Sequence, residues 1–233
     1  MNIIRNIPNS VTCLNLLAGM MSIVCSAYAD KPLWGLCGWQ WGAIFIAVGA
    51  LADFLDGFFA RLLRAYSELG KELDSLCDLV SFGVAPAFIL FHILPSAEAL
   101  PWLKWCVFLI PVAAALRLAR FNIDTRQTTF FIGLPVPANA IFWIGFAAMV
   151  AGGNAPFLLN PVVFLVLLVF ESWLMLSSFK LFSLKFSNYS FSPNRWRYLL
   201  VAAAVVLVFC MGWSGLMWLI IFYFLLSLCV GVK

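Results

Sequence analysis

Charged side chains are scarce in this sequence, and their scarcity excludes a water-soluble domain. Only 10% of the 233 residues are Asp, Glu, Lys or Arg, 64% are hydrophobic, and the mean hydropathy is +1.03. A soluble domain of this length would have too little polar side chain to cover its surface. The composition therefore predicts an integral membrane protein, with the lipid bilayer as its surroundings and no nucleic-acid partner.

Cysteine pairs are also lacking. The seven cysteines are odd in number, form no CxxC motif and mostly lie within apolar runs, which favours small packing residues over disulfides or a zinc site. The first apolar run has no small-residue cleavage site at its end. We therefore expect residues 10–29 to form a first helix of the mature protein.

Long apolar runs dominate the rest of the chain. A helix that crosses a bilayer needs about 20 apolar residues, and about 17 can suffice. Eight runs approach this length, at approximately 10–29, 40–63, 73–94, 102–121, 134–151, 157–177, 197–212 and 214–231. The last two are short and share a turn, so seven spans with one re-entrant hairpin is the alternative. We predict an all-α, polytopic bundle of about eight transmembrane helices that forms a single membrane domain over residues 1–233.

The positive charges predict the orientation of this bundle, because Lys and Arg concentrate in cytoplasmic loops. With a cytoplasmic N-terminus, eight spans place twelve of the fourteen Lys and Arg residues on the cytoplasmic side and leave only Lys31 and Lys104 outside. We therefore predict a protein of the cell (inner) membrane with both termini on the cytoplasmic side.

Four aspartates interrupt the apolar pattern between residues 52 and 78. Asp53 and Asp56 are three residues apart at the end of the second span, and Asp74 and Asp78 are four apart at the start of the third, so each pair lies on one helical face. An acid at the centre of a membrane helix costs about 2.5–3.5 kcal/mol on insertion scales, so four acids require compensation. Oxygen ligands suit Mg²⁺ or Mn²⁺, and two facing pairs suit two ions that clamp a transferring phosphoryl group. We predict these four aspartates as the metal ligands, in a cavity open to the cytoplasmic side.

Small residues lie on the same helical faces as the acids. Gly57 and Ala60 each follow an aspartate by four residues, and Gly70 precedes Asp74 by four, so their small side chains leave room for a substrate. Arg61 directly follows Ala60, and its guanidinium group suits a diphosphate.

Two other interpretations of the acids remain open. They could form ion pairs with Arg61, Arg64 and Lys71 at the membrane rim. They could also serve a cation transporter, although they cluster on one helix pair and we detect no internal repeat.

The full pattern of this stretch is Asp53-x2-Asp56-Gly57-x2-Ala60-Arg61-x8-Gly70-x3-Asp74-x3-Asp78. It resembles the complete signature of the CDP-alcohol phosphatidyltransferase family, and eight fixed residues over 26 positions make a specific match. The resemblance implies a membrane enzyme that moves a phosphatidyl group from a CDP-linked lipid, such as CDP-diacylglycerol, to an alcohol and releases CMP. It also implies a six-helix core, here residues 1–180, and commonly a homodimer. Residues 181–233 would add a cytoplasmic loop and two helices.

The resemblance further implies a role for each residue of the signature. Asp53, Asp56 and Asp74 would coordinate the metal pair, while Asp78 would act as general base and share in metal binding. The remaining residues would receive the CDP moiety of the lipid: Gly57, Ala60, Arg61 and Gly70.

Three more segments resemble the phosphatidylserine synthase branch of the family, in which L-serine is the acceptor. They are residues 7–12 with Asn15 and Gly19, residues 116–122 and residues 131–139. Arginines three apart on a helix can hold a carboxylate or phosphate, and prolines expose backbone groups that need a cavity or protein beside them. The predicted serine or phosphate site comprises Arg117, Arg120, Asn122, Pro135 and Asn139.

Alternatives remain for this second site. The arginines could be ordinary positive-inside anchors, and the prolines could simply start a helix. Glycerol 3-phosphate or inositol phosphate is the alternative acceptor within the same reaction type.

Overall fold

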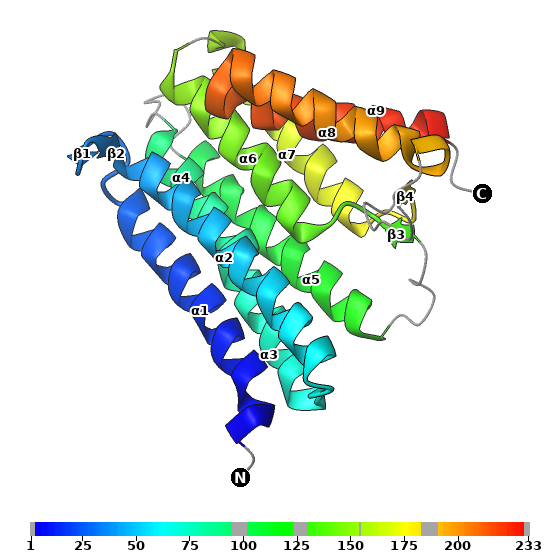
Figure 1. The fold of residues 1–233 in the computed structure, drawn as a ribbon. Coiled ribbons are helices and arrows are strands. Elements are labelled where there is room, and N and C mark those ends of the chain that lie inside the picture. The colour runs from blue at the N-terminus through cyan, green and yellow to red at the C-terminus, as the bar shows by residue number, and fades with distance from the viewer. Residues whose placement is uncertain (1–2, 95–101, 124–129, 154, 183–190, 231–233) are drawn as a thin grey trace. The chain divides into compact units, whose positions relative to one another are not determined.

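The computed structural model describes residues 3–94, 102–123, 130–153, 155–182 and 191–230, and nearly all of them are helical (Figure 1). The chain divides into a first unit, Met1–Ile123, and a second unit, Asp124–Lys233. The all-α membrane fold predicted from composition is confirmed.

The first unit contains the acid-bearing helices. Its helical elements, in chain order, are α1 (Ile3–Ser26), α2 (Gly38–Leu62), α3 (Glu68–Asp78), the π-helix η1 (Leu79–Val84), α4 (Ala85–Ile93), the 3-10 helix η2 (Leu103–Phe108) and α5 (Leu109–Ile123). A small antiparallel pair of strands, β1 (Pro32–Leu33) and β2 (Leu36–Cys37), joins α1 to α2. In Figure 1, α1 and α2 run side by side as the blue and light-blue helices.

The second unit is also mostly helical. Its elements are β3 (Phe130–Ile132), α6 (Val136–Ala151), the 3-10 helix η3 (Pro156–Leu159), α7 (Pro161–Leu176), β4 (Lys180–Phe182), α8 (Phe191–Met211), the 3-10 turn η4 (Gly212–Ser214) and α9 (Gly215–Val230). Strands β3 and β4 pair antiparallel, and α6 packs on both α7 and α9.

Every predicted apolar run coincides with a helical segment. Five described stretches are long and apolar enough to cross a membrane: Ile7–Ser26, Gly38–Leu62, Glu68–Ile93, Leu103–Ile123 and Asn194–Cys229. Helices α6 and α7 are apolar but shorter, and the last stretch contains both α8 and α9. Helix α8 begins at Phe191, before the predicted residue 197, because the helix continues through polar residues that lie beyond its apolar part.

The two pairs of short strands were not predicted. The β1–β2 pair closes through Trp34 and Gly35, which both have positive φ angles, of 46° and 89°. Two successive residues with positive φ are typical of the tight turn that joins antiparallel strands. Trp-Gly is not one of the pairs that favour such a turn, and two-residue strands are too short to produce an alternating pattern, so the sequence carried no hairpin signal here.

Small residues allow α1 to lie close against its neighbours. A Cβ atom on Gly49 of α2 would lie 2.8 Å from Oδ1 of Asn15, and one on Gly19 of α1 would lie 2.8 Å from the Cα atom of Ser81 in η1. The Ser81 hydroxyl donates a hydrogen bond of 2.8 Å to the carbonyl oxygen of Asn15. Membrane helices use small residues at such contacts because close approach maximises van der Waals packing. This packing positions one face of α1 over the acids of α2 and α3.

Candidate functional site

Three aspartates from two helices converge in the first unit. One carboxylate oxygen each from Asp53 and Asp56 on α2 and from Asp74 on α3 lies within 4.8 Å of the others. The chain returns through residues 63–67, and the Ser67 hydroxyl caps α3 by accepting a hydrogen bond of 3.0 Å from the amide of Gly70. This short return brings the end of α2 next to the start of α3. We call Asp53, Asp56 and Asp74 the acid trio.

The acid trio has the donor set of a divalent cation site. Its three ligand atoms are all carboxylate oxygens, which Mg²⁺ and Mn²⁺ prefer. Oδ1 of Asp74 is buried and, among the described residues, has no hydrogen-bond partner. A buried carboxylate oxygen without a donor is costly, and a bound cation would satisfy it. The residues present therefore fit a metal ion.

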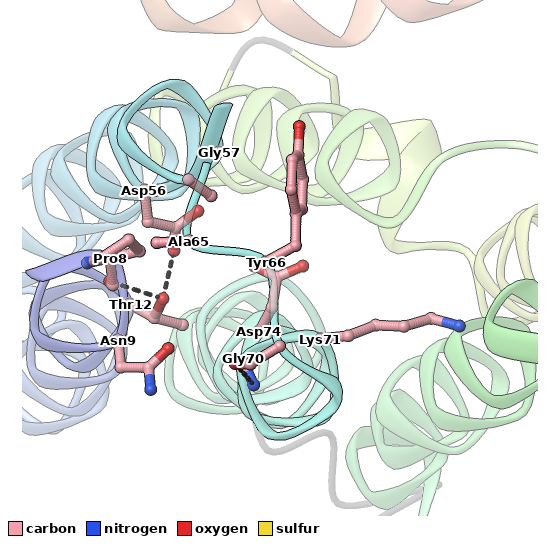
Figure 2. A pocket seen from close by; sticks show the side chains of 12 residues that line it. Pro8, Asn9, Thr12, Asp56, Gly57, Ala65, Tyr66, Gly70, Lys71 and Asp74 are labelled. Atoms are coloured by element: carbon pink, nitrogen blue, oxygen red, sulfur yellow. Dashed lines mark hydrogen bonds between the residues drawn. The ribbon is translucent and has the colours of Figure 1, made fainter. Parts of the chain in front are cut away.

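The alternative of rim ion pairs receives no support from the geometry. Arg61 and Arg64 are exposed, and within the described ranges neither forms an ion pair with the trio. The Lys71 ammonium instead donates a hydrogen bond of 2.7 Å to the carbonyl oxygen of Asn122. In Figure 2 the Lys71 side chain extends away from Asp56.

Two side chains of α1 donate hydrogen bonds to aspartates. The sequence analysis placed both in the first segment that resembles the phosphatidylserine synthase branch but gave them no contact with the acids. The Thr12 hydroxyl lies 2.5 Å from Oδ2 of Asp56 and donates to it (Figure 2). The Asn15 amide donates a hydrogen bond of 3.0 Å to Oδ1 of Asp78. Both α1 side chains are buried. Their spacing of three residues puts both side chains on one face of α1, and this was the signal that could have paired them with the acids.

Asp78 is not one of the acid trio, although it is close enough to interact electrostatically with all three of its members. It follows Asp74 by four residues, or about 6 Å of helix rise, and is only 9% exposed. The π-helix η1 begins immediately after it, and π turns inside helices frequently occur at functional sites. The structure thus places three predicted metal ligands together and gives the fourth a different partner, Asn15. Metal binding by Asp78 stays a prediction.

A cavity of about 170 Å³ adjoins the acid trio (Figure 2). The predicted small residues Gly57, Ala60 and Gly70 all line it, together with Asp56 and Asp74. A Cβ atom on Gly57 would meet nothing nearer than Nη1 of Arg61, at 3.8 Å. The glycine therefore borders open space. Arg61 itself is exposed near the cavity.

The predicted serine-site residues of α5 have varied surroundings. Arg117 is buried, with its guanidinium carbon 5.8 Å from the centre of the Phe121 ring, whereas Arg120 is exposed. The Asn122 amide donates a hydrogen bond of 3.0 Å to the Ser75 hydroxyl of α3. Asn122 therefore ties the end of α5 to the acid-bearing helix α3.

The other two predicted serine-site residues belong to the second unit. Pro135 immediately precedes α6 and serves as its N-cap residue. Asn139 is fully buried, and its Oδ1 accepts a hydrogen bond of 3.0 Å from the Trp143 indole. Their role in binding serine stays a prediction.

Replacing Thr12 by valine is expected to weaken Mn²⁺ binding about tenfold or more. Valine matches the shape of threonine but cannot donate to Asp56, and a hydrogen bond to a charged group contributes about 1.5–3 kcal/mol. Titration of the detergent-solubilised protein with Mn²⁺ measures the effect. The Thr12→Ser variant keeps the hydroxyl and serves as the control. Wild-type affinity in the valine variant would show that Asp56 does not need this donor.

Comparison with known proteins places the signature in a family context. A family model described as CDP-alcohol phosphatidyltransferase matches residues 5–182. The chain is 41% identical over 150 residues to the CDP-diacylglycerol–serine O-phosphatidyltransferase of Mycobacterium leprae, covering 61% of this chain and 47% of that protein. It is 31% identical over 175 residues to the Bacillus subtilis protein of the same name, and the match covers 75% of this chain and 88% of that protein. It is 36% identical over 147 residues to the Methanocaldococcus jannaschii protein of the same name, and the match covers 63% of each chain. The chain spans about half the length of the mycobacterial relatives it matches.

Proposed function

This chain belongs to the CDP-alcohol phosphatidyltransferase family, and on that premise we propose that it transfers the phosphatidyl group of CDP-diacylglycerol to the hydroxyl of L-serine and releases CMP. The observation that carries the proposal is the acid trio beside a cavity lined by small residues. The choice of serine is supported by the names of the relatives and by the segments around Arg117 and Pro135.

The acid trio would hold the metal in this proposal. Asp53, Asp56 and Asp74 provide its oxygen ligands, and Asp78 would contribute if two ions bind. When bound, Mg²⁺ or Mn²⁺ supplies positive charge that stabilises the diphosphate and the departing CMP. Thr12 keeps the Asp56 carboxylate in place from the α1 side.

The cavity beside the trio would receive the CDP moiety. Gly57, Ala60 and Gly70 keep its walls free of bulky side chains, so the diphosphate can approach the helix backbones. Arg61, exposed near this cavity, has a guanidinium whose fork of donors matches a phosphate.

Asp78 would act as the general base. The Asn15 amide holds Oδ1, which leaves the second carboxylate oxygen to accept the proton of the serine hydroxyl. The serine oxygen then bonds to the phosphorus that carries diacylglycerol. The bond from this phosphorus to the CMP oxygen breaks, and CMP leaves with the electron pair.

The acceptor site and the assembly are further parts of the proposal. Arg117 and Arg120 would bind the serine carboxylate, with Asn122 fixing α5 against α3. A part for Pro135 and Asn139 in binding serine is proposed from the resemblance of their segment alone. The distribution of Lys and Arg supports an inner-membrane protein with its termini and active site on the cytoplasmic side. We also propose that the functional form is a homodimer.

The function is tested by CMP release from CDP-dioleoylglycerol by the purified chain in detergent. With Mg²⁺ or Mn²⁺ present, serine should stimulate release, and EDTA should abolish it. Parallel reactions with glycerol 3-phosphate and inositol phosphate test the acceptor. Release with one of these but not with serine would overturn the serine assignment and keep the reaction type. Metal flux into liposomes without CMP release would favour a transporter.

Replacing Gly57 by valine is expected to raise the KM for the CDP-lipid about tenfold or more without lowering the melting temperature. The added side chain enters open space beside Arg61 and occupies room that the proposal gives to the substrate. Steady-state kinetics and thermal unfolding in detergent measure the two effects.

Gly49→Val is the matched comparison on the same helix. Its new side chain would collide with Asn15, so it should lower the melting temperature. An unchanged KM in Gly57→Val would place the CDP moiety elsewhere.

A further inference from the structure

Ser81 is a fully buried serine that connects the helix of Asp78 to α1. It lies inside the π-helix η1, three residues after Asp78. Its hydroxyl donates a hydrogen bond of 2.8 Å to the backbone carbonyl oxygen of Asn15. A carbonyl oxygen has two lone pairs, and the helical hydrogen bond within α1 uses only one of them. Ser81 therefore adds a bond between two helices without breaking one inside α1.

Asn15 is attached to the helix of Asp78 at two points. Its side-chain amide donates a hydrogen bond of 3.0 Å to Oδ1 of Asp78, while its backbone oxygen accepts the bond from Ser81. Asp78 and Ser81 are three residues apart in the continuous helical segment that runs from α3 into η1. Turns of π-helix often occur at functional sites. The two bonds together fix the backbone of Asn15 and its side chain against the same short segment.

The side chain of Asn15 depends on this attachment. Its Oδ1 is buried and, in the described part of the chain, has no hydrogen-bond partner. The bond to Asp78 is thus the one hydrogen bond that the described residues give to this side chain. Where the amide points is then decided by that bond and by the place at which the Asn15 backbone is held. Ser81 supplies the second of these constraints.

Glycines of α1 and α2 let both helices pack directly against Ser81. A Cβ atom on Gly19 would lie 2.8 Å from the Cα atom of Ser81, and one on Gly49 would lie 3.6 Å from the Cβ atom of Ser81. Close packing of this kind leaves a small side chain little room to move. The serine is therefore confined to the place from which its hydroxyl reaches Asn15.

We propose that Ser81 is a positioning residue for Asp78. By holding the backbone of Asn15, it keeps the Asn15 amide on Oδ1 of Asp78 and so directs the second carboxylate oxygen toward the hydroxyl of the serine substrate. The inference rests on the proposed function, which makes Asp78 the general base. A base must lie within hydrogen-bond distance of the proton that it accepts, and a misplacement of about 1 Å can cost on the order of a hundredfold in rate.

Replacing Ser81 by alanine tests this role. The variant loses the hydroxyl and adds no bulk, so kcat should fall about tenfold or more, while the KM for the CDP-lipid and the affinity for Mn²⁺ should stay within about twofold. Ser22→Ala is the matched control, because Ser22 is a fully buried serine of α1 whose hydroxyl has no hydrogen-bond partner among the described residues. It should change none of these values. An unchanged kcat in Ser81→Ala, or an equal fall in the control, would contradict the inference.

A double-mutant cycle tests whether Ser81 acts through Asn15. Asn15→Ala removes the amide, so adding Ser81→Ala to it should lower kcat by less than about twofold further. Additive losses would give Ser81 a separate structural role and overturn the proposal. Ser81→Cys keeps a side chain of similar size with a weaker donor, and its kcat should lie between those of the wild type and Ser81→Ala. It takes the place of the alanine variant in the cycle if that variant does not fold.

Hydrogen exchange of the Asn15 side-chain amide tests the contact without catalysis. In protein containing isotope-labelled asparagine, its NMR signal is the one missing from Asn15→Ala. Ser81→Ala should speed the exchange of this amide about tenfold or more, and Ser22→Ala should not. Unchanged exchange in Ser81→Ala would overturn the inference whether or not the protein is active.

Exchange and activity together separate the two proposals. Faster exchange with an unchanged kcat would overturn the positioning role and leave the proposed function standing. Faster exchange in a protein whose wild type releases no CMP with any alcohol would confirm the contact between Ser81 and Asn15 and reject the proposed function, and the positioning role with it.

Discussion

Replacing Asp74 by asparagine is expected to reduce CMP release about a thousandfold or more and to abolish stabilisation by Mn²⁺. Asparagine keeps the size of the side chain but removes the charge and one strong oxygen ligand from the acid trio. Oδ1 of Asp74 is buried without a hydrogen-bond partner in the described part of the chain, so a cation is its natural partner. CMP release and the melting temperature measured across a Mn²⁺ titration check both effects, because ligands that bind only the folded state raise its stability.

Glu68→Gln is the control for this experiment. Glu68 is an exposed acid in the first turn of the same helix and is not part of the trio, so its neutralisation should change neither activity nor the response to Mn²⁺. If Asp74→Asn is still stabilised by Mn²⁺ as the wild type is, the metal does not bind at the trio. A loss of folding without metal would instead indicate a structural role for the Asp74 carboxylate.

Replacing Asp78 by asparagine is expected to separate proton transfer from metal binding. Turnover should fall about 10²- to 10⁴-fold, the usual contribution of a general base, while affinity for Mn²⁺ and for the CDP-lipid should stay within about twofold. The reason is geometric: Asp78 is buried, contacts Asn15 of α1 and lies outside the acid trio. Single-turnover kinetics together with equilibrium binding of Mn²⁺ and CDP-lipid measure the two properties separately.

Asp30→Asn neutralises an exposed aspartate of the first unit and should behave as the wild type does. Substantial turnover in Asp78→Asn would remove Asp78 from the role of base. A loss of Mn²⁺ affinity comparable to that of Asp74→Asn would instead make it a ligand, as the resemblance to the family allows. The two aspartate variants, measured side by side, therefore distinguish base from ligand.

Much of the fold was predictable because the bilayer imposes simple requirements on sequence. Helices must satisfy their backbone hydrogen bonds internally, so long apolar runs become helices wherever they occur. Each of the eight predicted runs is helical in the structure. The short β1–β2 and β3–β4 pairs escaped prediction, since two or three residues carry no detectable period.

The acid trio was predictable for a similarly local reason. Asp53 and Asp56 share a helical face, and the turn to Asp74 is short, so periodicity and chain connectivity together bring the three carboxylates close. The same reasoning grouped Asp78 with them. A spacing of four residues places Asp74 and Asp78 on one face of α3. It does not say which neighbouring helix each of the two side chains meets.

The membrane class, the helices and the residues of the signature follow from the amino-acid sequence alone, because each depends on composition or on spacing within one or two adjacent elements. The three-dimensional packing alone reveals that Thr12 donates a hydrogen bond to Asp56, 44 residues away, and that Asn15 donates one to Asp78, 63 residues away. These relations depend on how α1 packs against α2, α3 and η1, through close contacts at Gly19 and Gly49, and no local pattern encodes such packing.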